Sequence, residues 1–278
     1  MSDTPAVPSL PTEPSPRVPA APAVWSVVAE KLTKVYGDKV AVDAIDLAVA
    51  PGEFFGILGP NGAGKSTTIK MLCGLVRPTS GRGLVLGHDV REDPVAVKAQ
   101  IGIMPEEVNT YERLSGRELL IFTGRMHGLS RAEAASRTEE LLRVVELSDE
   151  ESRKMIVDYS MGMRKKTVLA SALIHAPQVL FLDEPFNGID AVTTQALRGV
   201  LQKLAARGVT IFFSSHVLEV VEKLCTRIAI IHKGRLQVVG TLPEIREKTG
   251  HASDTPLQDI FVKVVGGNTE RGDLSWVK

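Results

Sequence analysis

Cysteine is scarce in this sequence. Cys73 and Cys225 are the only two among 278 residues, they lie far apart, and they match no metal-binding spacing. A cysteine-based metal site is therefore not expected, and this usage is typical of a reduced, cytosolic compartment. Cys73 follows Met71 and Leu72, and we interpret it as a small core residue.

A net charge is also absent, because 33 Lys and Arg residues balance 33 Asp and Glu residues. Without a net field there is no electrostatic argument for nucleic acid as the main partner, and we expect none. The hydrophobic share of 44% is that of an ordinary soluble protein. The chain is long enough for one large core, or for a core with a small subdomain.

Long apolar runs are missing too. No run approaches the roughly 18 residues that cross a bilayer. The N-terminal stretch also lacks the basic and apolar regions of a signal peptide. If the protein works at a membrane, we expect another chain to supply the membrane spans.

The most informative segment that is present reads Gly-Pro-Asn-Gly-Ala-Gly-Lys-Ser, at residues 59–66. It follows the apolar run 54–58 and leads into a helical segment, so the predicted order is buried strand, glycine loop, helix. This is the context in which the pattern G-x-x-x-x-G-K-[ST] identifies a phosphate-binding loop, or P-loop. The alternative, an ordinary glycine turn, does not require the lysine and serine that follow.

The residue types of this loop suit a triphosphate and its metal ion. Glycines let successive backbone N–H groups point at a phosphate, and the helix that follows adds its free N-terminal N–H groups. Lys65 can reach the β- and γ-phosphates, while the Ser66 hydroxyl can hold Mg²⁺. The expected nucleotide-binding residues of the loop are Gly59, Pro60, Asn61, Gly62, Ala63, Gly64, Lys65, Ser66 and Thr67.

Composition divides the chain into three parts. Residues 1–24 carry many prolines among Ala, Ser and Thr, so we expect a disordered tail. Residues 25–245 form an α/β domain with an all-helical insert at about 107–164 that should be a small subdomain. Residues 246–278 are a C-terminal extension with one short helix, whose N-cap we expect at Thr255, before Pro256.

Hydrophobic period and capping residues predict the elements. Ser115 with Glu118, and Ser130 with Glu133, have the spacing of capping boxes ahead of apolar periodic runs. Tyr36 falls between the first two strands, as an exposed loop aromatic that either packs or stacks on a purine. The expected strands are 25–32, a stretch within 40–49, 54–58, 83–86, 101–104, 179–182, 209–213, 227–231 and 235–239.

Two strands end in side chains with catalytic chemistry. Asp183 and Glu184 follow the continuous apolar run 179–182, at the sheet edge where open α/β sheets place their ligands. One acid can hold Mg²⁺ through water, and the other can accept a proton from an attacking water. His216 ends the strand expected beside that run, which puts its imidazole within reach of a γ-phosphate.

Ser160, Met161 and Gly162 begin a further helix that has no phosphate partner nearby in the sequence. A serine N-cap explains this helix start by itself. A second anion site is the alternative, because helix starts bind phosphate.

Taken together, the segment from about Val27 to Leu242 resembles the ATP-binding subunit of an ABC (ATP-binding cassette) transporter. In that family the P-loop is followed by a loop normally bearing Gln, a helical subdomain, a signature sequence like LSGGQ, an Asp-Glu pair, a D-loop and a switch histidine. In this sequence the P-loop is 59–66, Glu106 stands in the following loop, the helical subdomain is the insert 110–158, and the signature segment is 159–163. The Asp-Glu pair is Asp183 with Glu184, the D-loop is 187–190, and the switch histidine is His216.

The resemblance implies a fold and a mechanism. The fold is a RecA-like P-loop NTPase core with an antiparallel β subdomain and an inserted α-helical subdomain. Two cassettes, expected to be two copies of one chain, close head to tail on two ATP molecules, with Ser160 and Gly162 binding the other chain's γ-phosphate. The implied catalytic residues are Glu184, His216 and Lys65, and the implied Mg²⁺ ligands are Ser66, Glu106 and Asp183. Tyr36 would stack on adenine, and the D-loop residue Asp190 would lie at the nucleotide.

Two positions depart from the family pattern. Glu106 stands where Gln is usual, so a carboxylate replaces an amide near the metal and changes the charge of the site. In the signature segment Met161 replaces the first glycine and Met163 replaces Gln, while Ser160 and Gly162 are kept. An inactive site is not inferred from these changes.

The signature segment Tyr-Ser-Met-Gly-Met, with Pro-Glu-Glu at 105–107, resembles the branch that works with ABC-2-type permeases, often exporters. The implied protein is an ATPase held peripherally on the cytoplasmic face of the membrane by its permease. Two alternatives stay open: a soluble ABC ATPase of DNA repair or translation, and a regulatory nucleotide-binding module that hydrolyses slowly or not at all. The sequence does not reveal the cargo, because a cassette of this family touches its permease and not the transported substrate.

Overall fold

The computed structural model describes residues 25–266 of the chain. The expected disordered tail 1–24 and the last part of the C-terminal extension lie outside the described residues. None of the helices within 25–266 has the length and apolar character to cross a membrane.

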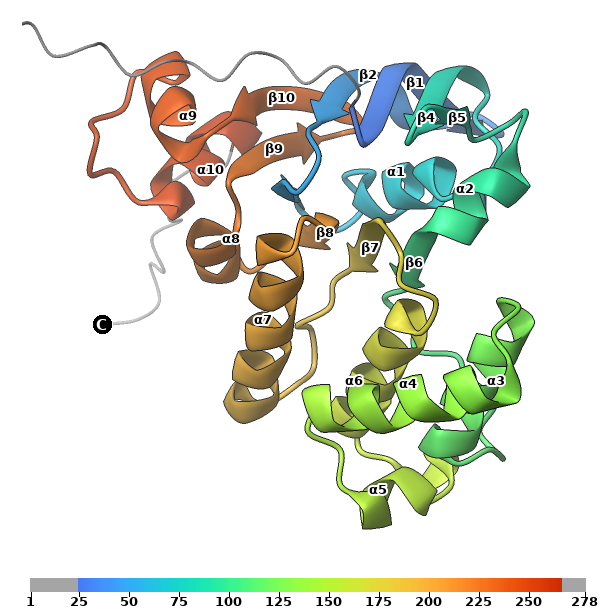
Figure 1. The fold of residues 1–278 in the computed structure, drawn as a ribbon. Helices are drawn as coiled ribbons and strands as arrows, with labels where there is room; N and C mark the ends of the chain where they lie inside the picture. The colour runs from blue at the N-terminus through green and yellow to red at the C-terminus, as the bar shows by residue number, and fades with distance from the viewer. Residues whose placement is uncertain (1–24, 267–278) are drawn as a thin grey trace, which may run out of the picture.

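Two sheets form the framework (Figure 1). The first is antiparallel, in the order β2-β1-β4-β5, and the second has the order β10-β9-β3-β8-β7-β6. The strands of the first are β1 (Val27–Tyr36), β2 (Lys39–Val49), β4 (Ser80–Val85) and β5 (His88–Asp89). Those of the second are β3 (Phe54–Leu58), β6 (Ile101–Met104), β7 (Val179–Asp183), β8 (Thr210–Ser215), β9 (Arg227–His232) and β10 (Arg235–Gly240).

The second sheet is parallel from β6 to β9, and only β10 pairs antiparallel. All residues of β3, β7 and β8 are buried, as expected for parallel strands covered on both faces. Alternate residues enter two separate cores: Phe55 and Ile57 face the antiparallel sheet, whereas Phe54 and Leu58 face the opposite side. The pairing of β7 with β8 confirms that the strand ending near His216 lies beside the strand ending at Asp183.

The helices cover both faces of this sheet and form the insert. Between the two sheets lies α1 (Lys65–Leu72), which contacts β7 as well as β1, β2 and β4. The other helices are α2 (Pro94–Gln100), α3 (Gly116–Met126), α4 (Arg131–Val144), α5 (Asp149–Arg153), the 3-10 turn η1 (Ile156–Asp158), α6 (Met161–Leu173), α7 (Ala191–Ala206), α8 (Leu218–Leu224), α9 (Leu242–Lys248) and α10 (Leu257–Val265).

The helical insert contains α3, α4 and α5 and has a small core of its own, centred on Leu120, Leu142 and Ile156. Its two ends meet, because an isolated bridge pairs Ser115 with Met155. Figure 1 shows the insert at the end of the molecule away from the antiparallel sheet. The following helix, α6, contacts both α3 and strand β6, and so runs from the insert into the core.

The predicted capping boxes at Ser115 and Ser130 are confirmed, and so is the N-cap at Ser160. Further boxes begin α5 at Ser148 and α9 at Thr241. The expected N-cap at Thr255 is wrong. The extended Pro256 (φ −58°, ψ 145°) is the N-cap of α10, no side chain caps the helix, and it therefore starts at Leu257.

Candidate functional site

The P-loop connects β3 to α1 and borders a cavity of about 260 Å³. Lys65 is 6% exposed, and its Nζ donates to the carbonyls of Gly59 (2.8 Å) and Pro60 (3.4 Å). The cavity is lined by Asn61, Gly62, Ala63, Gly64, Lys65, Ser66 and Thr67, together with Lys39, Ala41, Glu106 and Glu184. Residues of four distant parts of the chain therefore meet at the loop.

Two glycines of the loop are required by close backbone approaches. A Cβ atom on Gly59 would lie 2.4 Å from the Ile231 carbonyl oxygen, and one on Gly64 would lie 2.6 Å from that of Ala41. Gly64 also has φ +110°, a conformation that residues with a side chain rarely adopt. The loop is thus held against β2 and β9 with no room for a side chain.

Asp183 is the last residue of β7, and its side chain contacts Ser66 at the start of α1. It is 3% exposed, and its Oδ1 accepts hydrogen bonds from the hydroxyls of Ser66 (3.1 Å) and Ser214 (2.6 Å). Within residues 25–266 no three or more His, Cys, Asp or Glu side chains cluster as a metal site. Mg²⁺ suits this donor set, because it usually takes one or two carboxylates and completes its shell with water and phosphate oxygens.

Glu184 is buried beside the P-loop lysine. It is 4% exposed, its Oε1 lies 3.3 Å from Lys65 Nζ, and that oxygen accepts no hydrogen bond from the residues that the structure describes. The Nδ1 of His216 lies 2.9 Å from Glu184 Oε2. The Glu184 backbone is left-handed (φ +48°), a strained conformation for a residue with a side chain and one often found at functional sites. A carboxylate held in this way is suited to act as a base.

The signature segment lies at another helix start. Ser160 caps α6 by accepting from the Met163 N–H, and a Cβ on Gly162 would lie 3.0 Å from Thr193 Oγ1 at the start of α7. Asp190 caps α7 and accepts from the Thr193 N–H (2.9 Å) and Oγ1 (2.7 Å), and these hydrogen bonds lower the pKa of its carboxyl. None of the three predicted residues lines the P-loop cavity of its own chain.

Tyr36 differs from its predicted setting. It is the last residue of β1 rather than a loop residue, because the hairpin turn to β2 needs only the two residues after it. It is 47% exposed and does not line the cavity. The Lys34 Nζ lies over its ring, 4.8 Å from the ring centroid. Its pairing partner Lys39 does line the cavity, so Tyr36 lies at the margin of the site.

Ser214 was not predicted from the sequence, although it holds both acids. Its hydroxyl donates to Asp183 Oδ1 and accepts from the Glu184 N–H at 3.0 Å. The available signal is a polar Ser-Ser pair that interrupts an apolar strand next to His216. A polar residue at that point of a buried strand must find a hydrogen-bond partner inside the protein.

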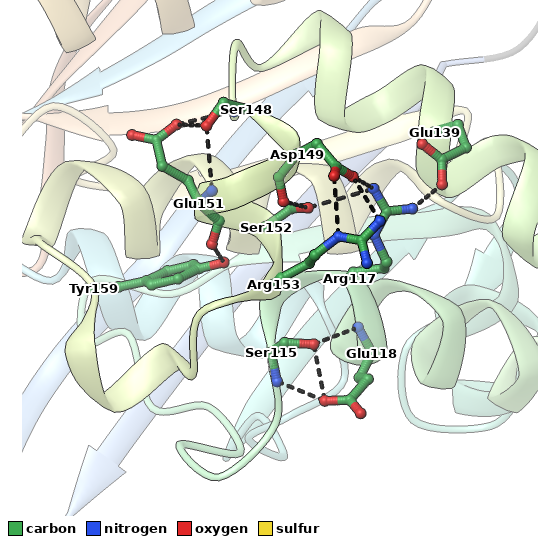
Figure 2. Close-up of polar contacts among 10 residues, drawn as sticks. All are labelled: Ser115, Arg117, Glu118, Glu139, Ser148, Asp149, Glu151, Ser152, Arg153 and Tyr159. Carbon is green, nitrogen blue, oxygen red and sulfur yellow. Dashed lines mark hydrogen bonds and ion pairs between the residues drawn. The ribbon is translucent and has the colours of Figure 1, made fainter.

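Tyr159 ties the signature segment to the helical insert (Figure 2). Its ring is buried, and its hydroxyl accepts from the Gly116 N–H (3.2 Å) and donates to the Glu151 carbonyl (2.8 Å). Burial raises the pKa of this phenol, which stays a neutral hydroxyl. Arg117, on α3, links this helix to α4 and α5 through ion pairs with Glu139 and Asp149.

Replacing Tyr159 with Phe should destabilise the fold by about 1–3 kcal/mol, because it leaves the buried Gly116 N–H without an acceptor. Urea unfolding with and without nucleotide measures the effect. Tyr111→Phe is the matched control, since Tyr111 is 62% exposed and should tolerate the change. Equal midpoints for the two variants would contradict a supporting role of the Tyr159 hydroxyl.

Comparison with known proteins identifies the family. The ABC transporter family model matches residues 42–187, about half of the chain. The linearmycin resistance ATP-binding protein LnrL of Bacillus subtilis is 40% identical over 83% of this chain and 73% of its own length. The daunorubicin resistance ATP-binding protein DrrA3 of Streptomyces coeruleorubidus is 40% identical over 81% and 71%.

Solved structures agree with this assignment. The ATP-binding subunit of an ABC transporter superposes with a TM-score of 0.79 at 31% identity, covering 86% of this chain and 98% of that one. The dimeric cassette MJ0796 bound to ADP and Pi superposes with a TM-score of 0.73, and at 24% identity it supports the fold alone. The predicted P-loop NTPase fold is thereby confirmed. The chain belongs to the ABC transporter family, as an ATP-binding and ATP-hydrolysing subunit.

Proposed function

We propose that this chain binds MgATP at the P-loop cavity, pairs with a second copy of itself, and powers a separate ABC-2-type permease on the cytoplasmic face of a membrane. The observation that carries the proposal is that Lys65, Ser66 and Glu184 line one cavity, with the signature helix start outside it. Asp183 joins this site by its hydrogen bond with Ser66, and His216 joins it by its contact with Glu184.

The chain's own residues divide the work of binding. Backbone N–H groups of the loop and the start of α1 receive the phosphates, and the Lys65 ammonium neutralises their charge. Ser66, Asp183 and Glu106 hold the metal ion, which when bound offsets the negative charge of the phosphates. Tyr36, at the margin of the cavity, stacks on the adenine ring.

Hydrolysis uses the buried acid. Glu184 accepts a proton from the attacking water, and its Oε1, which accepts no hydrogen bond from the described residues, lies beside Lys65 on the P-loop side of the site. His216 holds the water and the γ-phosphate, and its contact with Glu184 Oε2 fixes the two side chains relative to each other. The reaction is therefore positioned by groups that end two neighbouring strands.

In the proposed dimer, the signature helix start of the second copy supplies further ligands to the phosphate bound at the P-loop. Ser160 is exposed, and the first N–H groups of α6 have no acceptor within the helix. This helix start does not line its own P-loop cavity, which supports the proposal that it binds a phosphate of the other subunit's nucleotide. Asp190, on the adjacent helix start, approaches the same interface.

A groove next to the Glu106 loop fits the permease. Its lining includes Val108, Tyr111 and His175, and Tyr111 packs edge-on against Phe122 at 5.5 Å. Tyr111, Phe122 and Met126 are 62%, 41% and 71% exposed, an apolar surface that a partner would cover. A permease segment here would contact the residues just after Glu106. Two relatives are named as linearmycin and daunorubicin resistance proteins, which supports export of an antibiotic or other drug-like compound as the proposed transport.

Affinity capture from native membranes tests the proposal. Glu184→Gln is used as bait with ATP and Mg²⁺ after detergent extraction, because a slow mutant should keep the closed dimer on its partner. A double variant that also carries Lys65→Met is the control. We expect nucleotide-dependent recovery of a polytopic membrane protein. Recovery of soluble proteins alone, from a bait that dimerises with ATP, would instead favour the soluble ATPase.

A further inference from the structure

A buried lysine on α6 reaches the turn that carries the catalytic acid. Lys165 is 2% exposed, and its Nζ donates to the carbonyls of Glu184 (2.9 Å), Pro185 (3.1 Å) and Asn187 (2.6 Å). All of these carbonyls belong to the turn that follows β7, which we call the 184–187 turn. The lysine itself lies five residues after Ser160, on the signature helix.

The ammonium group is matched to this turn. A lysine offers three N–H donors and no acceptor, and here each donor has a backbone carbonyl. Burial lowers the pKa of Lys165, and the negative charges of Glu184 and Glu106 oppose that effect. A charged group is retained inside a protein at such a cost only when its hydrogen bonds are satisfied.

The turn needs an external support. The Glu184 backbone has φ +48°, a strained conformation that persists only when the surroundings determine it. Ser214 holds the N–H of this residue from the sheet side, and Lys165 holds its carbonyl from the helix side. The peptide groups on both sides of the Glu184 side chain are therefore fixed.

We propose that Lys165 is a positioning residue for Glu184: its side chain fixes the 184–187 turn on the signature helix and so keeps the carboxylate aimed into the P-loop cavity. This inference rests on the proposed role of Glu184 as the base. Lys165 does not touch the cavity itself, so it contributes to the rate through the acid and not by contact with nucleotide.

A link between the two nucleotides of a dimer follows. Ser160 caps the helix that carries Lys165, and the two residues lie about 7.5 Å apart along its axis. The helix start faces the nucleotide of the other subunit in the proposed dimer, and the lysine holds the acid of its own subunit. A shift of this helix would therefore move the acid in one site when the other site gains or loses its phosphate.

Steady-state kinetics of Lys165→Met tests the inference. This variant keeps the alkyl chain but removes the donors, so the turn loses its support while the P-loop is unchanged. We expect kcat for ATP to fall at least tenfold with KM and the MgATP dissociation constant within threefold of wild type. Lys165→Gln, which restores two N–H donors, should recover part of kcat.

Lys166→Met is the matched control. The Lys166 ammonium also donates to a backbone carbonyl, but that carbonyl belongs to Glu146 in the helical insert and not to the 184–187 turn. It should keep the wild-type kcat. A wild-type kcat in Lys165→Met, or a parallel loss of kcat, nucleotide affinity and melting temperature, would overturn the positioning role. If Lys165→Met does not fold, the same criteria apply to Lys165→Gln. Wild-type activity of Glu184→Gln would refute the base assignment separately.

Discussion

Glu184→Gln is expected to lower the rate of ATP hydrolysis by about 10²–10⁴-fold, the usual contribution of a general base. Glutamine has the size of glutamate but cannot accept the proton of the attacking water. The variant also loses the charge that faces Lys65 at 3.3 Å. MgATP binding should remain, because the P-loop backbone and Lys65 are unchanged, and the ATP-bound dimer should accumulate.

Phosphate release measures kcat, calorimetry measures nucleotide affinity, and light scattering with ATP measures the dimer. Glu107→Gln is the control, since Glu107 is exposed and does not line the cavity. It should hydrolyse ATP like wild type. Residual turnover above one tenth of the wild-type rate in Glu184→Gln would assign the proton transfer to another group. Equal, near-zero rates in wild type and Glu184→Gln would favour the regulatory module.

Gly64→Ala should abolish nucleotide binding and lower the melting temperature. A Cβ at this position meets the Ala41 carbonyl oxygen at 2.6 Å, and the backbone has φ +110°. The strained backbone costs about 1–3 kcal/mol and the overpacking about 1–3 kcal/mol. The loop can relieve the collision only by moving away from β2, which displaces the N–H groups that would hold the phosphates.

Gly62→Ala separates these two costs. Gly62 also has a positive φ, +77°, but a Cβ there meets no atom within 4 Å. We therefore expect a smaller loss of stability and measurable nucleotide binding for this variant. Thermal unfolding and nucleotide titration of both variants make the comparison. Similar losses in the two would mean that backbone strain alone, and not the contact with β2, determines the shape of the loop.

The sequence-based predictions succeed where the signal is local. The P-loop between a buried strand and a helix, and the capping boxes at Ser115 and Ser130, depend on residues within a few positions of each other. The adjacency of β7 and β8 is also confirmed, because continuous apolar runs ending in polar residues are typical of neighbouring parallel strands.

Particular side-chain contacts between distant segments could not be predicted. The side chains of Ser214 and Lys165 meet the acid turn only through the tertiary fold, 31 and 19 positions from their partners Asp183 and Glu184. Short helices such as α8 and α9 have too few residues for a clear period. The loop prediction for Tyr36 is wrong, although Gly37 and Asp38 form a dipeptide typical of a two-residue hairpin turn, which lets the strand continue to Tyr36.

The helical insert has a consequence for how the chain folds. Capping boxes begin α3, α4 and α5, and the bridge between Ser115 and Met155 brings the two ends of the insert together. The bridge that closes the insert joins residues 40 positions apart, whereas Phe54 of β3 pairs with Ile211 of β8, 157 positions away. Contacts between residues closer in sequence form faster, so we expect the insert to fold sooner than the sheet. The strands β3 and β7, by contrast, can complete their sheet only after β8 and β9 have been synthesised. The insert can thus be ordered before the sheet that holds the catalytic groups exists.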